Sequence, residues 1–288
     1  MAATQCNARR IWNSIRRNSL LMSGGAIILL FLLVGLFAPV IAPHDPLEQN
    51  LRQRMAPGFW AGNYEYLLGT DELGRDILSR IIYGTRTSLL MGFACVLIVL
   101  VIGGGVGMIC GYYGGSLDAI VMRLVDILLS FPYILLAIAI MAVFGQGITN
   151  AVIAVAIVFT PSAARITRSV SLSLRTLPFV EAARCYGAST NRIMFKHLVP
   201  NLIPHLIVYG ALSMGETILS IAALGFLGLG VEPPIPEWGA MISTGKDMLI
   251  LGKWWLSAFP GLAITLVVTG FALLGDGLRD LLDPRMRS

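Results

Sequence analysis

The chain has 288 residues, of which 56% are hydrophobic and only 13% are charged. Soluble domains carry about 25% charged residues, so this composition argues against disorder, nucleic-acid binding and a secreted disulfide scaffold. A hydrocarbon core about 30 Å thick is crossed by about 20 helical residues, which leaves room for roughly five to seven spans. The net charge is +5. Because the basic residues lie between apolar runs, sorting of positive loops to the cytoplasm explains them better than a nucleic-acid partner does.

Residues 1–19 form a polar segment with four arginines, and the apolar run of residues 20–41 follows it. A basic start before an apolar run is also typical of a signal peptide. This run is too long for that, and no small-residue cleavage site closes it. We therefore predict a cytoplasmic N-terminal segment and a first transmembrane helix. The longest polar stretch, residues 42–86, is then an extracytoplasmic loop.

The second predicted span is Ser88–Cys110. Glycine recurs every fourth residue at the end of this span and just beyond it. The residues are Gly103, Gly107, Gly111 and Gly115. Such a stripe lets a second helix approach closely, and the alternative is a flexible hinge. The regular spacing favours packing.

Leu117–Pro132 is less apolar and leads into an apolar run to Phe144, the third span. Arg123 and Asp126 share a helix face there, so we expect them to pair. A fourth span begins at Ala151–Phe159, and arginines after it mark the return to the cytoplasm.

Residues 169–200 form a basic cytoplasmic stretch before a fifth span, Leu202–Leu229, which Glu216 interrupts. Gly230–Trp255 is an expected outer loop with several prolines, suited either to docking or to a rigid turn. Its three tryptophans are the ring type that settles at a membrane interface. A sixth span, Leu256–Leu274, and a cytoplasmic tail, residues 279–288, complete the chain. Six spans with both termini inside place twice as many Lys and Arg in the cytoplasm as outside.

No catalytic constellation is present in the sequence: HExxH, GxSxG and a phosphate-binding loop are all missing. The stretch from Gly239 to Asp247 resembles a phosphate-binding loop, but it has five residues between its glycines and Asp in place of Ser or Thr. Cysteines and histidines are too dispersed for a metal site. The sequence therefore predicts a chain that is not an enzyme and holds no metal.

A motif in the cytoplasmic stretch combines an acid, two small residues and a glycine at fixed spacing. Its residues are Glu181, Ala182, Ala183, Gly187 and, at its end, Pro200. It predicts a short helix, Phe179–Tyr186, that ends at Gly187, and a second helix, Thr190–Lys196. The alanines leave a low surface where a groove of another protein can seat the helix. An ordinary amphipathic surface helix is the alternative.

This spacing resembles the coupling loop of ABC importer permeases, EAA-x3-G-x9-I-x-LP. His197 and Val199 depart from it, because Ile and Leu are usual at those positions. Further stretches resemble the C-type membrane subunits of dipeptide, oligopeptide and nickel importers, in order and from about Leu20 to Met286. They are LGTDELGRDILSR (68–80), MRLVD (122–126) with FP (131–132), AALGFLGLG (222–230), PEWGAM (236–241) and LGDGLRD (274–280) with DP (283–284).

The resemblance implies an all-α polytopic membrane protein with the type I ABC importer permease fold, whose core, residues 87–278, holds five helices and the coupling loop. It implies a homologous B-type permease, two ATP-binding subunits and an extracytoplasmic solute-binding protein as partners, in the bacterial inner membrane. ATP and magnesium would act on the ATP-binding subunits. Expected cargo is dipeptides or oligopeptides. Nickel or another small solute is one alternative, and an ATP-independent secondary transporter, which often shows internal repeats, is another.

Two further sets of residues are candidates. The extracytoplasmic motif contains Asp71, Gly74, Arg75 and Asp76, with Asp76 and Arg80 four apart as an expected surface pair. We expect it to shape the outer lip of the protein rather than to bind ligand. Glu216 lies mid-span, where an ionisable residue is costly and tends to face a cavity or a partner. It is a candidate for the translocation path, with a purely structural hydrogen bond as the alternative.

Overall fold

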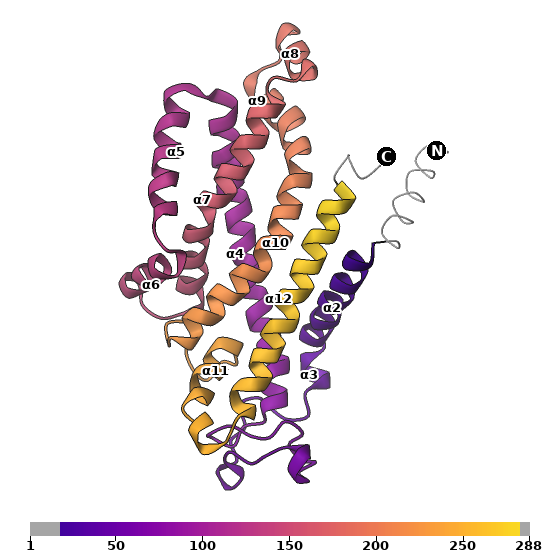
Figure 1. Ribbon diagram of the computed structural model, residues 1–288, viewed down its shortest axis with the longest axis vertical. Helices are drawn as coiled ribbons and strands as arrows, with labels where there is room; N and C mark the ends of the chain where they lie inside the picture. The colour runs from indigo at the N-terminus through magenta and orange to yellow at the C-terminus, as the bar shows by residue number, and fades with distance from the viewer. Residues whose placement is uncertain (1–17, 283–288) are drawn as a thin grey trace, which may run out of the picture.

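The computed structural model describes residues 18–282, and the regular structure of these residues is helical apart from one isolated bridge (Figure 1). The longest non-helical segment, residues 42–76, is irregular except for two short 3-10 turns and this bridge. The predictions for the N-terminal arginines and for the end of the tail fall outside the described residues. The helices are α2 (Ser19–Leu36), α3 (Ala38–Ile41), α4 (Ile77–Tyr113), α5 (Gly115–Ser130), α6 (Tyr133–Phe144), α7 (Ile148–Leu174), α8 (Pro178–Cys185), α9 (Thr190–Ile193), α10 (Val199–Phe226), α11 (Trp238–Lys246) and α12 (Trp255–Leu282).

Within residues 18–282, five helical stretches are long and apolar enough to cross a membrane: α2, α4, α7, α12 and the continuous run Thr190–Phe226. The predicted third span differs from these. It is broken at Phe131–Pro132, where α5 and α6 meet at 95°. Proline disfavours helical backbone at the residue before it, so the break falls at that pair. The prediction of six spans holds when the bent pair counts as one, and the membrane-spanning all-α fold is confirmed.

The glycine stripe on α4 packs against α7, as predicted. A Cβ added at Gly107 would lie 2.3 Å from the Ala164 carbonyl oxygen, and one at Gly111 would lie 2.5 Å from the Ser171 Cβ. Only glycine lets the two backbones come this close. The stripe ends before Gly115, which has a φ of +62° and starts α5.

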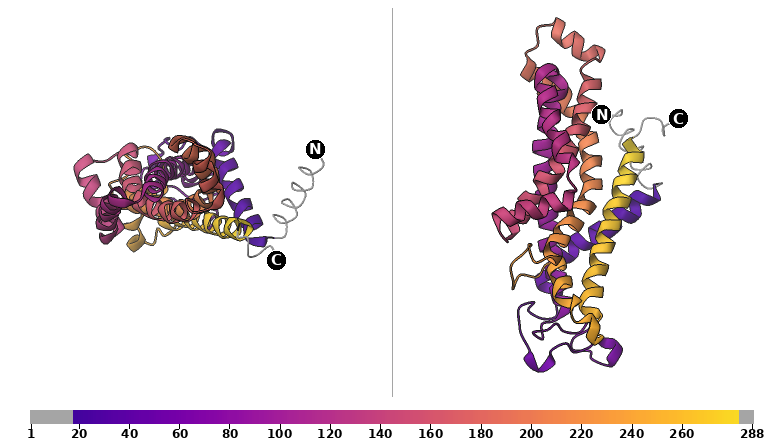
Figure 2. Two further views of the ribbon diagram at one scale, coloured as in Figure 1. Left: turned by 90° about the horizontal axis from the view of Figure 1, so that it is seen from above. Right: turned by 60° about the vertical axis from the view of Figure 1, so that its left-hand side comes forward.

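The first and last described helices lie side by side (Figures 1 and 2). A Cβ at Gly24 of α2 would lie 2.4 Å from the backbone nitrogen of Leu274 in α12. Asn18 caps α2 by accepting from the Leu21 N–H, and its side-chain amide donates to the Gly277 carbonyl. The contact between α2 and α12 is therefore a close backbone crossing, which the sequence analysis did not identify.

The stretch predicted as an outer loop contains α11. Glu237 caps this helix, because its carboxylate accepts hydrogen bonds from the N–H groups of Gly239 and Ala240. The prediction of three interfacial tryptophans is wrong for two of them. Trp238 is fully buried and donates to the Ile81 carbonyl, and Trp255 is also buried, whereas Trp254 is exposed.

Candidate functional site

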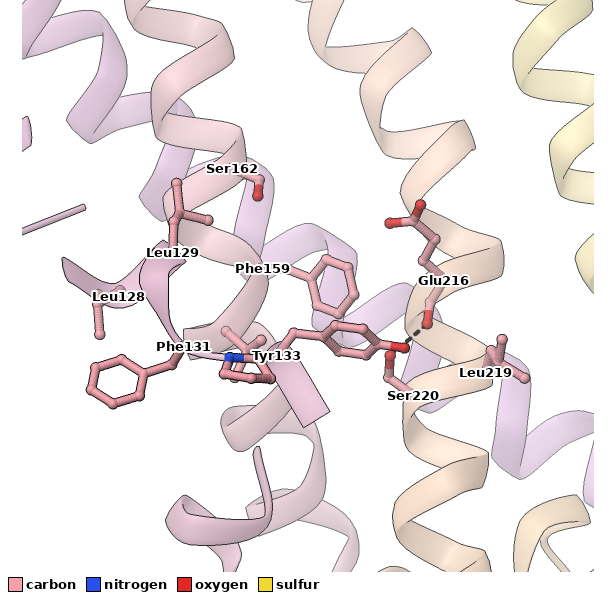
Figure 3. Close-up of a pocket in the computed structure, with 11 residues that line it drawn as sticks. Leu128, Leu129, Phe131, Tyr133, Phe159, Ser162, Glu216, Leu219 and Ser220 are labelled. Carbon is pink, nitrogen blue, oxygen red and sulfur yellow. Dashed lines mark hydrogen bonds between the residues drawn. The ribbon is translucent and has the colours of Figure 1, made fainter. Parts of the chain in front are cut away.

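A pocket of 490 Å³ lies between the α5–α6 bend, α7 and α10. Tyr133 reaches across from the bend toward Glu216 and Ser220 of α10 (Figure 3). The Ser220 hydroxyl donates to the backbone carbonyl of Glu216, not to its carboxylate. The Glu216 side chain is exposed on the pocket wall. The remaining lining side chains are mostly apolar: Leu128, Leu129, Phe131, Pro132, Val158, Phe159, Ser162 and Leu219.

Two ion pairs fasten α5 to α7. Arg168 holds Asp118 with two hydrogen bonds, and Arg165 pairs with Asp126. The expected partner of Asp126 was Arg123, but the structure pairs it with Arg165 instead. Arg165 reaches the Asp126 carboxylate from the neighbouring helix α7. Residues three apart on one helix, such as Arg123 and Asp126, can pair only along the surface of that helix.

The motif predicted for coupling lies at one end of the molecule, where α8 stands beyond the long helices (Figure 1). The predicted helix is confirmed as α8, and Gly187 beyond it has a φ of +73°. Glu181 and Ala182 are exposed, while Ala183 is half-buried and faces the rest of the protein. Glu181, Ala182 and Ala183 therefore lie together on α8, but they do not all face outward, and Gly187 lies in the turn after the helix.

The second predicted helix runs on into α10 without a break. A wider π-helical turn, Met194–Leu198, precedes Pro200, which is exposed in the first turn of α10. Proline cannot donate to the carbonyl four residues earlier, and a wider turn accommodates it. Pro200 is thus apart from the exposed face of α8.

The motif at the start of α4 forms a buried ionic network. Asp71 accepts from the backbone N–H of Arg75 and, at 2.7 Å, from its Nε. Arg80 approaches Asp71 at 3.5 Å and donates to the Pro46 carbonyl. Gly74 has a φ of +75°, and a Cβ there would lie 1.9 Å from the Asn50 carbonyl oxygen.

The predicted surface pair between Asp76 and Arg80 is wrong. Both side chains are buried, and Asp76 instead caps α4 by accepting from the N–H and hydroxyl of Ser79. Burial, together with the nearby Asp71 carboxylate, raises the pKa of Glu72. These contacts tie the segment between α3 and α4 to the start of α4.

Within residues 18–282 there is no group of three or more His, Cys, Asp and Glu side chains that could hold a metal ion. The stretch that resembled a phosphate-binding loop lies in α11, where Gly245 contacts Leu256 and Ser257 of α12. A helix packed in this way cannot wrap a phosphate.

The contacts that join the ends of α4, α7 and α8 were not predicted from the sequence. Arg175 and Tyr112 are the main residues there, and Arg175 is one of the arginines after the fourth predicted span that in the sequence indicate only the return to the cytoplasm. No sequence signal marked these contacts, because Arg175 and the Gly114 turn lie 61 residues apart and only the fold brings them together.

Comparison with known proteins decides the family. A family model described as the binding-protein-dependent transport system inner membrane component matches residues 103–288. The chain belongs to this family. A second model, the N-terminal TM domain of oligopeptide transport permease C, matches residues 7–57. The protein is therefore a permease subunit of an ABC importer, a multi-pass inner-membrane protein, and the interpretation as a secondary transporter is set aside.

Curated relatives match this permease over nearly its full length. It is 45% identical to the di/tripeptide transport system permease protein DppC of Pseudomonas aeruginosa (97% of this chain, 93% of the relative). It is 44% identical to the dipeptide transport system permease protein DppC of Alkalihalophilus pseudofirmus (97% and 90%). It is 41% identical to the glutathione transport system permease protein GsiD of Pectobacterium atrosepticum (97% and 92%).

Solved structures confirm the fold of this permease. Two crystal forms of the inward-facing MetNI methionine ABC transporter match with TM-scores of 0.56 and 0.58. Sequence identity is 22% and 21%, and the matches cover 71% and 72% of this chain and 97% and 98% of the other. At this identity the likeness shows the type I permease fold and no more.

Proposed function

We propose that this permease carries dipeptides or short oligopeptides inward across the inner membrane. The observation that carries the proposal is the exposed carboxylate of Glu216 in an open pocket otherwise rich in apolar and aromatic side chains. A peptide offers an ammonium group to the carboxylate and side chains to Tyr133, Phe131 and Phe159. The names of the curated relatives, which refer to dipeptides, di- and tripeptides and glutathione, agree with this cargo.

The pocket supports a path shared with a second, homologous permease. An ionisable side chain in a span is costly against lipid and faces a cavity or a partner. In the single chain, Glu216 is exposed. Asp126 and Arg165, which form the neighbouring ion pair, are exposed as well. A second permease placed against this face covers these charges and closes the pocket on its open side.

In this proposal α8 docks on an ATP-binding subunit. Its exposed residues Glu181 and Ala182 face the ATPase, Ala183 fixes α8 to the permease, and Gly187 turns the chain back toward α10. Two ATP-binding subunits hydrolyse ATP with magnesium, and a solute-binding protein delivers cargo on the other side. Both termini and α8 lie in the cytoplasm. Each ATP-driven movement of α8 reorients the helices around Glu216.

Uptake tests the cargo. A strain that lacks this gene and its complemented control are offered labelled dipeptide, a longer labelled peptide and nickel in separate assays. We expect peptide uptake to fail in the deletion strain and to return on complementation, and the two peptides set the length class. Loss of nickel uptake alone would overturn the cargo while keeping the permease.

A further inference from the structure

One arginine in the short connection between α7 and α8 contacts the C-terminal end of α4. Arg175 follows α7, and its Nη1 donates to the carbonyls of Gly111 at 3.2 Å and Tyr112 at 3.4 Å. These carbonyls belong to the last turn of α4, where no further helical N–H groups are available to them. A positive side chain at this end of the helix also interacts favourably with the negative end of the helix dipole. Arg175 therefore caps α4 from the chain segment that leads into α8.

The glycine turn after α4 makes room for this contact. Gly114 has a φ of +66°, and a Cβ placed on it would lie 2.8 Å from Nη1 of Arg175. Any other residue would push the guanidinium away from the carbonyls it holds. The turn between α4 and α5 is thus shaped around the arginine.

A second contact joins α8 to the same turn of α4. The guanidinium of Arg184 lies 5.2 Å from the centre of the Tyr112 ring, within the range of a cation–π interaction. Val180 of α8 is fully buried in an apolar cluster with Met108 of α4 and Leu198. Both ends of α8 are therefore fastened to α4: the base through Arg175 and the last turn through Arg184.

The glycine stripe extends this attachment deeper into the protein. Gly111, whose carbonyl Arg175 holds, is also where α4 touches Ser171 of α7. From there α4 and α7 stay in backbone contact down to Gly103. A displacement of α8 that reaches Gly111 is thus passed to two spans together, one of which lines the Glu216 pocket.

We propose that Arg175 is the positioning residue that transmits movement of α8 to α4 and α7. The proposal rests on the proposed function of α8 as the docking helix for the ATPase. Without the arginine, the short connection from α7 to α8 takes up the movement, and ATP is hydrolysed without transport.

The experiment measures labelled dipeptide transported per ATP hydrolysed by the complete importer in proteoliposomes. Arg175→Met keeps the apolar stem and removes the donors. We expect the ratio to fall about tenfold, because each hydrogen bond to a charged group is worth about a factor of ten or more, while hydrolysis per assembled complex stays close to wild type. Arg175→Lys, which restores a charged donor, should recover part of the ratio.

Two variants serve as controls. Arg279→Ala removes an exposed arginine near the end of α12 and should leave the ratio unchanged. Gly187→Val strains the turn after α8 and tests the docking role itself. If Gly187→Val uncouples the importer and Arg175→Met does not, the role of Arg175 fails and the docking helix stands. If neither variant uncouples it, the docking role fails.

A purely structural role for Arg175 predicts something different. Uptake and hydrolysis would then fall together in Arg175→Met, with the ratio unchanged, and that result would overturn the proposal. If Arg175→Met does not assemble, Arg175→Gln carries the test, since it keeps an amide donor but no charge. A lowered ratio in that variant supports the proposal, and an unchanged ratio overturns it.

Discussion

Glu216 places a carboxylate on the wall of a pocket whose other polar groups are few. Ser220 and Ser162 are hydroxyls, and Tyr133 contributes a phenol. None of these groups carries a positive charge, so no side chain that lines the pocket neutralises Glu216. In the proposed function, a cationic group on the cargo does so, and a carboxylate in this position would select for charge rather than for the shape of a side chain.

We expect Glu216→Gln to lower uptake of a labelled dipeptide about tenfold, because a hydrogen bond to a charged group contributes roughly 1.5–3 kcal/mol. Assembly with the partner subunits should be retained, since Gln has nearly the same size. Initial rates are compared with those of Glu48→Gln, an exposed acid in the segment before α4. Wild-type uptake in Glu216→Gln would remove this residue from the path.

Glu237 is an acid of a different kind, because it is buried and holds the start of α11. Burial raises its pKa, although the N–H groups of Gly239 and Ala240 work in the opposite direction. A carboxyl whose pKa is higher in the folded state binds more protons when folded. The free energy of unfolding therefore falls as pH rises from the unfolded pKa through the folded one.

The thermal midpoint of the purified permease should accordingly decrease as pH rises above about 4.5, where an unperturbed Glu titrates. Glu237→Gln should flatten that part of the profile, because the group no longer titrates. Glu232→Gln, an exposed acid five residues earlier, is the matched control and should keep the wild-type slope. An unchanged slope in Glu237→Gln would show that another group sets the dependence.

At the scale of elements, α4 and α7 form the rigid centre of the molecule. Their contact depends on glycines that allow backbone against backbone, and two ion pairs add α5 to the same unit. The break at Phe131–Pro132 then turns α6 away from α5. The pocket exists because this bend leaves space between α5 and α10.

Gly107→Ala should therefore destabilise the permease. The new Cβ would lie 2.3 Å from a backbone oxygen of α7, so the helices must separate, at a cost of roughly 1–3 kcal/mol. The thermal midpoint in detergent measures this. Gly105→Ala lies two residues away on α4 with nothing within 4 Å, and it should be neutral or slightly stabilising. Equal midpoints for the two variants would contradict the packing role.

The sequence predicted those features that depend on local composition and spacing. Apolar length identified the spans, the four-residue glycine repeat identified the face of α4, and Gly187 identified the end of α8. Contacts between residues far apart in the sequence were not predicted. The capping of α4 by Arg175, the pairing of Asp126 with Arg165 and the burial of Asp76 depend on how helices are placed in space.

The outer loop shows a further limit of the sequence. The prolines and tryptophans of that stretch are also frequent in exposed turns at membrane surfaces, so α11 was not recognised. Glu237 before a helix-compatible run was the available signal, since a negative side chain near a helix N-terminus is stabilised by the helix dipole. Trp238 is buried because its ring packs against Phe31 and its N–H reaches a carbonyl.

At the scale of the whole molecule, α8 and the segment between α3 and α4 lie at opposite ends (Figure 1). The long helices join these two ends (Figure 2). The Glu216 pocket is lined by residues of α5, α6, α7 and α10. An importer needs this separation, because cargo arrives on one side of the membrane and ATP acts on the other.

Cys185 reports the orientation directly. It is exposed on α8, whereas Cys95 and Cys110 are buried. In a Cys6→Ser background without ATP-binding subunits, we expect a membrane-impermeant maleimide to label Cys185 in inverted vesicles only. Tyr64→Cys, introduced at an exposed position between α3 and α4, should be labelled in right-side-out vesicles only. The reverse pattern would invert the proposed topology.

The pairing of α2 with α12 bears on how the protein is made. Asn18 and Gly277 are 259 residues apart, so the N-terminal helix enters the bilayer long before the ribosome has produced the helix it packs against. Until then the surface around Gly24 lacks the helix it packs against. A chain that stops short of α12 leaves this surface unmatched, and membrane quality control could recognise it in an unfinished subunit.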